Sequence, residues 1–301
     1  SLAIIDIAIA SGFNSQRRFN DCFKSTMGLT PSEVRRASEF QHTAELSLEL
    51  SFRPPLNWSH LYNFLDRRKI EHLEWCEHNT YGRAIELGQT RGHFEISHQA
   101  PHNHLQLKLR LNQWHDLMRI VYRIRKLFDL DAPIDRIDRQ LKPLCPANFR
   151  YQAGIRLPGI WDTYEAGLRA ILGQQVSVTQ ATRLVSTLVK HLGTPYESGI
   201  KLFPAAKTIA HSDLEFLSIP HSRRETLRLF SQWYQQTKQP DELQQWLSIK
   251  GIGPWTVNYV KMRAQQEPDV WLENDAGIAR VQTHFAKVPD PLQAAPWRSY
   301  L

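Results

Sequence analysis

Residues 247–260 (LSIKGIGPWTVNYV) constrain the fold of this chain more than any other feature of its sequence. Gly251 and Gly253 flank an apolar Ile252, and Pro254 stands where a second helix would begin, because a first helical position does not need an N–H. Glycines let the backbone approach a ligand closely, and the free amides that open a helix attract an anion. The run predicts a hairpin of two helices that grips one phosphate without reading a base. A plain helix–helix turn is the alternative that the pattern leaves open.

The charge of the chain favours a polyanionic partner. The formal net charge is +7 and the isoelectric point is near 9.4, and neutralising phosphates with Lys or Arg releases counterions. Cys22, Cys76 and Cys145 have no CxxC spacing, which argues against disulfides, a zinc ribbon or an iron–sulfur cluster. We expect no membrane span and no signal peptide, and a cytoplasmic protein associated with the nucleoid through DNA. The start at Ser1 and the end at Leu301 suggest a fragment.

The pattern along the chain predicts an α+β protein that is predominantly helical. We expect a helix-turn-helix remnant over 1–42, a small antiparallel α+β domain over 46–128 and an all-helical domain over 129–301. Period-two alternation predicts strands over 46–52 and 104–111. Helices are predicted over 58–69, 113–128, 162–191, 223–237 and 276–285, and the third of them begins at an expected capping box of Asp162 and Glu165.

The N-terminal block has two short amphipathic helices around Gly12. Its run IxDIAxxSGFNSQxxFNxxFKxxxGxTPxxxR closely resembles the second helix-turn-helix of AraC-type regulators, as found in Ada-type proteins. The resemblance implies a core of Phe13, Phe19 and Phe23. It implies DNA contacts through Ser15, Gln16, Arg17, Arg18 and Asn20. A surface helix pair with a solvated basic face is the alternative.

The C-terminal part resembles the helix-hairpin-helix DNA glycosylases, and within them bacterial DNA-3-methyladenine glycosylases of the AlkA type. The matching runs cover about 250 residues: 54–58 (PPLNW), 64–68 (FLDRR), 156–159 (RLPG), 170–178 (AILGQQVSV), 255–259 (WTVNY) and 296–300 (PWRSY). Glycosylases of this superfamily that also cut the strand have a Lys nucleophile where this chain has Trp255, which cannot form a Schiff base. The resemblance implies base excision alone, on double-stranded DNA containing alkylated bases, by a monomer.

The resemblance also implies a set of site residues. Asp275 would be the catalytic carboxylate, although it could also simply cap the helix after it. Trp255, Tyr259 and Phe64 would line the base pocket, and Trp255 and Tyr259 share a helix face, for which aromatic packing is the other explanation. Gln175 would wedge into the duplex in place of the flipped nucleotide. Gly251, Gly253 and Thr256 would bind DNA, and the carbonyls of Leu247, Ile249 and Gly251 could hold a monovalent cation.

The implied chemistry needs no cofactor. Breaking an N-glycosidic bond builds positive charge on the sugar, which one carboxylate can stabilise. At the wedge position, Gln175 stands where the family has Leu. Two other departures point to a different substrate range: Asn274 replaces an acidic residue and Ala276 replaces an aromatic one. The family's last helix would lie past Leu301. Two other functions compete: an Ada-like transcription regulator whose glycosylase-like part only binds or senses DNA, and a non-catalytic scaffold.

Overall fold

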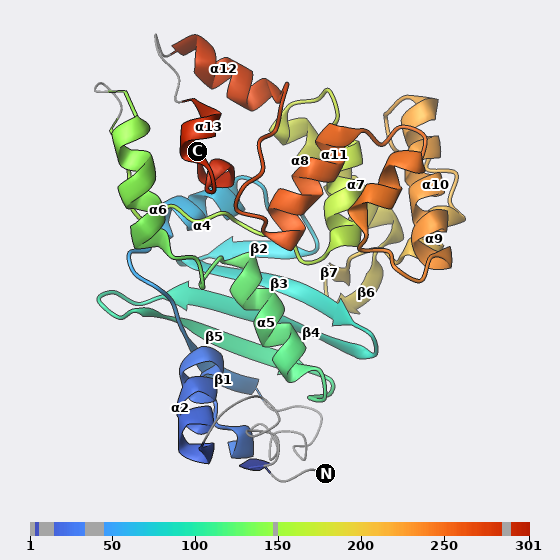
Figure 1. The fold of residues 1–301 in the computed structure, drawn as a ribbon. Helices are drawn as coiled ribbons and strands as arrows, with labels where there is room; N and C mark the ends of the chain where they lie inside the picture. The colour runs from blue at the N-terminus through green and yellow to red at the C-terminus, as the bar shows by residue number, and fades with distance from the viewer. Residues whose placement is uncertain (1–3, 6–14, 34–44, 147–149, 285–289) are drawn as a thin grey trace.

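The structure is a computed structural model, and it describes residues 4–5, 15–33, 45–146, 150–284 and 290–301. A five-stranded antiparallel sheet lies in the middle of the molecule, and most of the helices lie above it as drawn in Figure 1. The predicted α+β class, mostly helical, is confirmed. The first helix of the predicted helix-turn-helix, with Phe13, lies outside the described residues.

The sheet has the strand order β1-β5-β4-β3-β2. Its strands are β1 (Glu45–Ser51), β2 (Glu74–Glu77), β3 (Thr80–Leu87), β4 (Thr90–His98) and β5 (His104–Leu111). The register pairs Leu48 with Leu107 and Phe94 with Leu109, so that alternate apolar residues share one face. That face packs against α4 (Trp58–Asp66) and α5 (Leu117–Leu127). The predicted strand over 104–111 is confirmed, and the one over 46–52 is shifted by one residue.

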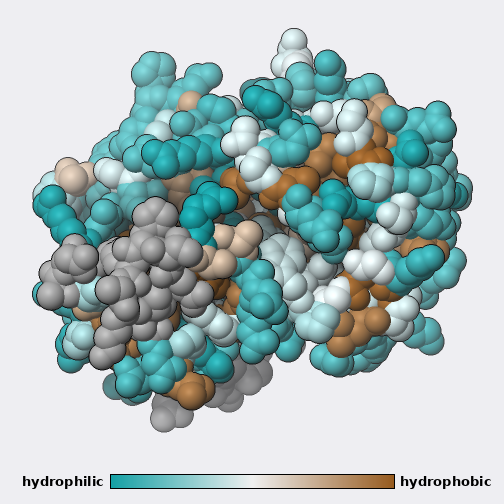
Figure 2. All heavy atoms as spheres, turned by 90° about the horizontal axis from the view of Figure 1, so that it is seen from above, coloured by the Kyte–Doolittle hydropathy of each residue, from teal (hydrophilic) through white to brown (hydrophobic). Residues whose placement is uncertain are grey.

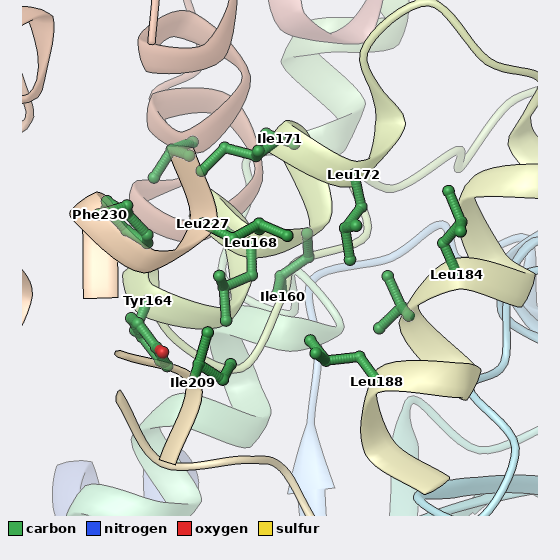
Figure 3. Packing of buried hydrophobic residues seen from close by; sticks show 14 of the residues in the cluster. Ile160, Tyr164, Leu168, Ile171, Leu172, Leu184, Leu188, Ile209, Leu227 and Phe230 are labelled. Atoms are coloured by element: carbon green, nitrogen blue, oxygen red, sulfur yellow. The ribbon is translucent and has the colours of Figure 1, made fainter. Parts of the chain in front are cut away.

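A second core lies among the helices of the C-terminal half. It is formed by α7 (Thr163–Gly173), α8 (Val178–Leu192), α9 (Ala206–Ala210), α10 (His221–Gln236) and α11 (Pro254–Val260). Figure 3 shows Leu168, Ile171 and Leu227 pointing toward one another from α7 and α10. Gly167 lets these helices approach, because a Cβ there would lie 2.6 Å from the Phe230 ring.

The prediction of one helix over 162–191 is wrong. The chain leaves the helix after Gly173 and starts again at Val178, with Ser177 as the new N-cap. Between the two, Gln175 has a φ of +58°, in the left-handed region. The capping box is half formed: the Asp162 side chain accepts from the Glu165 amide at 2.9 Å, while the Glu165 carboxylate lies among arginines instead.

The remaining helices follow the sequence pattern within a few residues. The helices predicted over 58–69, 113–128 and 223–237 are α4, α5 and α10, and the one over 276–285 is α12 (Ala276–His284). The C-terminal half also contains a hairpin of β6 (Thr194–Glu197) and β7 (Ile200–Leu202) that the sequence analysis missed. Further short elements are α6 (Ile134–Leu141) and α13 (Pro291–Ala294), the 3-10 turns η1 (Lys142–Leu144), η2 (Leu243–Ser248) and η4 (Arg298–Tyr300), and the π-helical η3 (Lys261–Gln265).

Candidate active site and nucleic-acid interface

The glycine hairpin forms as predicted, between η2 and α11. Pro254 is the first residue of α11, and Gly253 before it is extended. Gly251 has a φ of +90°, and a Cβ there would lie 2.2 Å from the Thr226 hydroxyl oxygen of α10. A Cβ on Gly253 would meet nothing within 4 Å in the described part of the chain. Internal packing therefore explains Gly251 and leaves the space at Gly253 open to a ligand.

Asp275 lies between the hairpin helix and α12. Its Oδ1 accepts from the amides of Gly277 at 2.8 Å and Ile278 at 3.2 Å, so the predicted N-cap is confirmed. Its Oδ2 accepts from the indole Nε1 of Trp255 at 3.2 Å. The preceding Asn274 has a φ of 60°, which turns the chain into this cap. The carboxylate is half-buried, so that it is fixed in place yet within reach of solvent.

The three predicted pocket residues come together from two distant parts of the chain. Trp255 and Tyr259 stack with their ring centroids 5.3 Å apart and an interplanar angle of 21°. Arg263 of η3 connects them to Phe64 of α4, because its Cζ lies 5.7 Å from the Tyr259 ring centroid and 5.1 Å from that of Phe64. Arg68 covers Phe64 at 3.9 Å. The sequence analysis missed both arginines, although Arg68 lies in the quoted run 64–68.

The break between α7 and α8 lies against the hairpin. Gln174 donates from Nε2 to the Gly251 carbonyl at 3.0 Å and to the Thr256 hydroxyl at 3.2 Å. Thr256 is buried, with 2% of its surface exposed, so its hydroxyl serves this internal contact. The neighbouring Gln175, the predicted wedge, is exposed. Gln174 is a third residue that the sequence analysis did not single out, and it joins the predicted wedge to the predicted phosphate grip.

Of the hairpin carbonyls predicted to hold a cation, two already accept a hydrogen bond. The Ile249 carbonyl accepts from the Ile252 amide at 3.0 Å, and that of Gly251 accepts from Gln174. Each carbonyl oxygen keeps a second lone pair. Neutral carbonyl donors of this kind, together with that of Leu247, suit a monovalent cation.

The side of the molecule that carries α11 and α12 is shown in Figure 2. Its surface is mostly hydrophilic, and hydrophobic side chains reach it in the centre and in the half toward α10. A mixed surface of this kind can accept both phosphates and unstacked bases.

The residues predicted to contact DNA in the N-terminal block lie on or next to α2 (Gln16–Met27). Ser15 is its N-cap and accepts from the Arg18 amide at 3.2 Å. Gln16, Arg17 and Arg18 are exposed, whereas Asn20 is half-buried. The predicted core residue Phe19 is buried, and its ring centroid lies 5.5 Å from that of the half-buried Phe23. Figure 1 shows α2 beside β1, on the side of the sheet away from α11 and α12.

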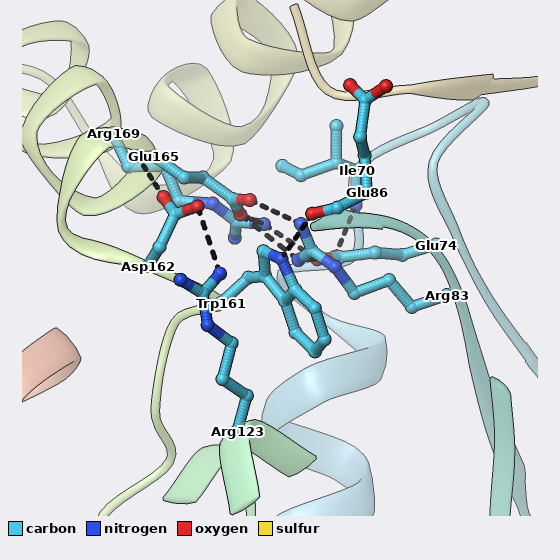
Figure 4. A network of polar contacts seen from close by, with 9 residues as sticks. All are labelled: Ile70, Glu74, Arg83, Glu86, Arg123, Trp161, Asp162, Glu165 and Arg169. Carbon is cyan, nitrogen blue, oxygen red and sulfur yellow. Dashed lines mark hydrogen bonds and ion pairs between the residues drawn. The ribbon is translucent and has the colours of Figure 1, made fainter. Parts of the chain in front are cut away.

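A buried ion cluster joins the sheet to α7. Arg83 of β3 contacts Glu74 of β2 at 2.7 Å and also Glu165 of α7. Arg169, one turn further along α7, lies 2.6 Å from each of the two carboxylates. Figure 4 shows these four side chains converging beside Trp161. All four are at least 85% buried, so the cluster fixes the helix that carries Gln174 relative to the sheet.

Family models match two segments of the chain. Residues 47–162 match the AlkA N-terminal domain, and residues 1–36 match bacterial regulatory helix-turn-helix proteins of the AraC family. The match to the AlkA N-terminal domain is thus preceded by a match to an AraC-type helix-turn-helix segment. This confirms both resemblances drawn from the sequence.

Curated relatives match most of the chain. A probable bifunctional transcriptional activator/DNA repair enzyme AlkA of Mycobacterium tuberculosis is 29% identical over 98% of this chain. The chain spans 64% of that relative's length. The DNA-3-methyladenine glycosylase 2 of Escherichia coli is 29% identical over 83% of this chain and 93% of its own.

A solved structure has the same fold. The 3-methyladenine DNA glycosylase from Archaeoglobus fulgidus superposes with a TM-score of 0.65 at 18% identity, covering 83% of this chain and 90% of that one. In the described part of the chain, no helix is both long and apolar enough to cross a membrane.

Proposed function

We propose that the chain is a monofunctional DNA glycosylase that flips alkylated bases, of the 3-methyladenine and 7-methylguanine type, out of double-stranded DNA and removes them by hydrolysis. The observation that carries this proposal is the Asp275 carboxylate, which is half-buried and hydrogen-bonded to Trp255 of the hairpin helix. The names of the relatives point to the same activity. The AraC-type segment adds a second DNA-binding element.

In this mechanism Asp275 stabilises the positive charge that develops on the deoxyribose. As the glycosidic bond breaks, its electron pair leaves with the base, and water adds to the sugar carbon and gives up a proton. A carboxylate about 4 Å away in an effective dielectric near 20 contributes on the order of 4 kcal/mol, or roughly a thousandfold in rate. A methylated purine is already cationic, so the reaction does not need a separate general acid.

The other site residues have supporting roles. The backbone at Gly251 and Gly253 and the amides opening α11 would hold a phosphate, and Gln175 would fill the gap left by the base. Trp255, Tyr259 and Phe64 would contact the flipped base. The hairpin carbonyls would hold a monovalent cation that stiffens the grip, and no chemical step passes through it. We propose that the protein acts as a cytoplasmic monomer at the bacterial nucleoid.

Incubation with methylated duplex DNA tests this function. We expect release of free 3-methyladenine and 7-methylguanine, measured by mass spectrometry, and intact strands until the abasic sites are cleaved by alkali. Borohydride should trap no covalent complex, because Trp255 cannot form a Schiff base. Strand cleavage without alkali, or a trapped adduct, would contradict the monofunctional assignment. If no base is released, the glycosylase proposal itself is wrong.

A further inference from the structure

A continuous line of half-buried side chains runs from the proposed catalytic carboxylate to a pair of arginines. We call it the site row: Asp275, Trp255, Tyr259, Arg263, Phe64 and Arg68. Each member touches the next, through the indole hydrogen bond, the ring stack and the cation–π contacts given above. All six have intermediate exposure. A ligand placed at any point along the row can therefore reach both aromatic and charged groups.

The two arginines are held so that donor groups remain available. Arg263 donates from Nε to the Pro158 carbonyl at 2.6 Å, and its own carbonyl accepts from the Ile160 amide at 2.8 Å. Its two Nη groups have no hydrogen-bond partner among the residues that the structure describes. Arg68 makes one long hydrogen bond, from Nη1 to the Phe64 carbonyl at 3.5 Å. Arg263 is thus held in place through its Nε, and its two Nη groups remain available as donors. Paired N–H donors of this kind recognise oxygen acceptors.

The charge at this end of the row is positive. Asp275 carries one negative charge and the two arginines carry two positive charges, so the row has a net charge of +1 at neutral pH. Burial lowers the pKa of both guanidinium groups. The charge of Arg263 lowers the pKa of Arg68 further, and the charge of Arg169 lowers that of Arg263, yet an arginine stays protonated at neutral pH. Arg169, whose charge acts on Arg263, is itself paired with Glu74 and Glu165.

These cations already occupy aromatic faces that could otherwise attract a positively charged base. Arg68 lies over Phe64 at 3.9 Å, and Arg263 lies near both Phe64 and Tyr259. At this end of the row, the aromatic rings therefore already stabilise a cation, namely the protein's own guanidinium groups. A second cation placed there would meet like charges, whereas a neutral base with a carbonyl oxygen would meet N–H donors.

We propose that Arg68 and Arg263 determine substrate specificity by favouring neutral bases that present a carbonyl acceptor over bases with a fixed positive charge. The inference rests on the proposed glycosylase function and deepens it. Among the bases that the site can excise, the guanidinium pair raises the excision rate of neutral bases relative to that of cationic ones. Asp275 keeps its role at the sugar for both classes.

A matched pair of substrates tests this proposal. In a mildly acidic buffer, where N1 of the methylated base keeps its proton, duplexes containing hypoxanthine or 7-methylhypoxanthine present the same ring and the same carbonyl, and differ by one methyl group and one positive charge. For each protein, the excision rate of the cationic base, corrected for spontaneous loss, is divided by that of the neutral base. The ratio of affinities for the two duplexes is measured in parallel. The variants are Arg68→Met and Arg263→Lys, and the control is Arg139→Met on α6, whose side chain is 74% exposed.

We expect Arg68→Met to raise the cationic-to-neutral ratio by about tenfold, since it removes one like charge near the base. Arg263→Lys keeps the charge but loses the fork, and should lower excision of hypoxanthine several-fold with less effect on the cationic base. Arg139→Met should leave the ratio unchanged. Ratios within twofold of the wild type in both site-row variants would overturn the inference. If no protein excises either base, the glycosylase function fails, and the affinity ratio alone decides whether the arginines discriminate by charge.

Discussion

The buried ion cluster gives a stability prediction whose size follows from its geometry. Glu165 contacts both Arg83 and Arg169, and its side chain is only 1% exposed. Glu165→Gln keeps the shape but leaves two buried guanidinium groups facing the single carboxylate of Glu74. Removing one partner of a buried ionic network costs about 3–5 kcal/mol. In a protein of this size, that corresponds to a fall in Tm of roughly 5–10 °C.

Differential scanning calorimetry of three variants would measure this effect. The control is Asp135→Asn, which breaks the Arg139–Asp135 pair at 2.7 Å, where both side chains are at least 69% exposed, and it should cost less than about 1 kcal/mol. Adding Arg169→Met to Glu165→Gln should restore part of the lost stability, because it removes the surplus positive charge. A Glu165→Gln protein as stable as the Asp135→Asn control would refute the reasoning.

The same cluster sets a pH dependence. Burial alone would raise the pKa of Glu165, but the charges and hydrogen bonds of Arg83 and Arg169 outweigh it and hold that pKa below its ordinary 4.5. A carboxylate whose pKa is lower in the folded state than in the unfolded state stabilises the fold at pH values above its unfolded-state pKa. The contribution is therefore present above about pH 4.5 and is lost as the pH falls through the lower folded value.

Five further variants probe the hairpin, the break between α7 and α8, and the buried Asp129. Gly253→Ala should leave the Tm within about 1 °C of the wild type while weakening DNA affinity. Gly251→Ala should lower the Tm markedly, because its Cβ would clash with Thr226. Equal Tm values for the two variants would contradict this. Gln174→Leu should weaken DNA affinity several-fold, as measured by fluorescence anisotropy, because it loses the contacts with Gly251 and Thr256. Gln175→Leu should not disturb the hairpin. An unchanged affinity for Gln174→Leu would show that these two contacts do not support DNA binding. Burial raises the pKa of Asp129 from 3.8 to about 6. As the pH rises from about 4 to about 6, the free energy of unfolding of the wild type should therefore fall relative to that of Asp129→Asn. A difference between the two proteins that does not change with pH would contradict that shift.

The sequence predicted the local structure where periodicity or capping decides it. The strand over 104–111 alternates strictly, and the hairpin has both its glycines and Pro254 in place. The prediction failed at 162–191, where Gln174 and Ser177 leave the helical conformation and Gln175 is left-handed. The N-cap Ser177 is a local signal for the second helix, but the apolar pattern on both sides of the break hides it.

The candidate site was only partly predictable for a similar reason. Asp275 and Trp255 were found through the motif that contains both of them, and they form a hydrogen bond. Arg263 meets Phe64 only after the sheet layer and the helical layer have packed together. A contact between residues so far apart in the chain leaves no periodic signal in the sequence. From the sequence alone, the two arginines cannot be told from ordinary surface charges.

The central claim is that the negative charge of Asp275, rather than its capping role, drives base excision. Asp275→Asn tests it directly, because Asn caps a helix about as well as Asp does and removes only the charge. Asp290→Asn is the matched control, since Asp290 caps α13 through the Leu292 amide at 2.9 Å. Under single-turnover conditions with methylated DNA, we predict that Asp275→Asn slows base release by roughly a thousandfold. We predict that Asp290→Asn leaves it unchanged. Equal rates for Asp275→Asn and the wild type would contradict the mechanism.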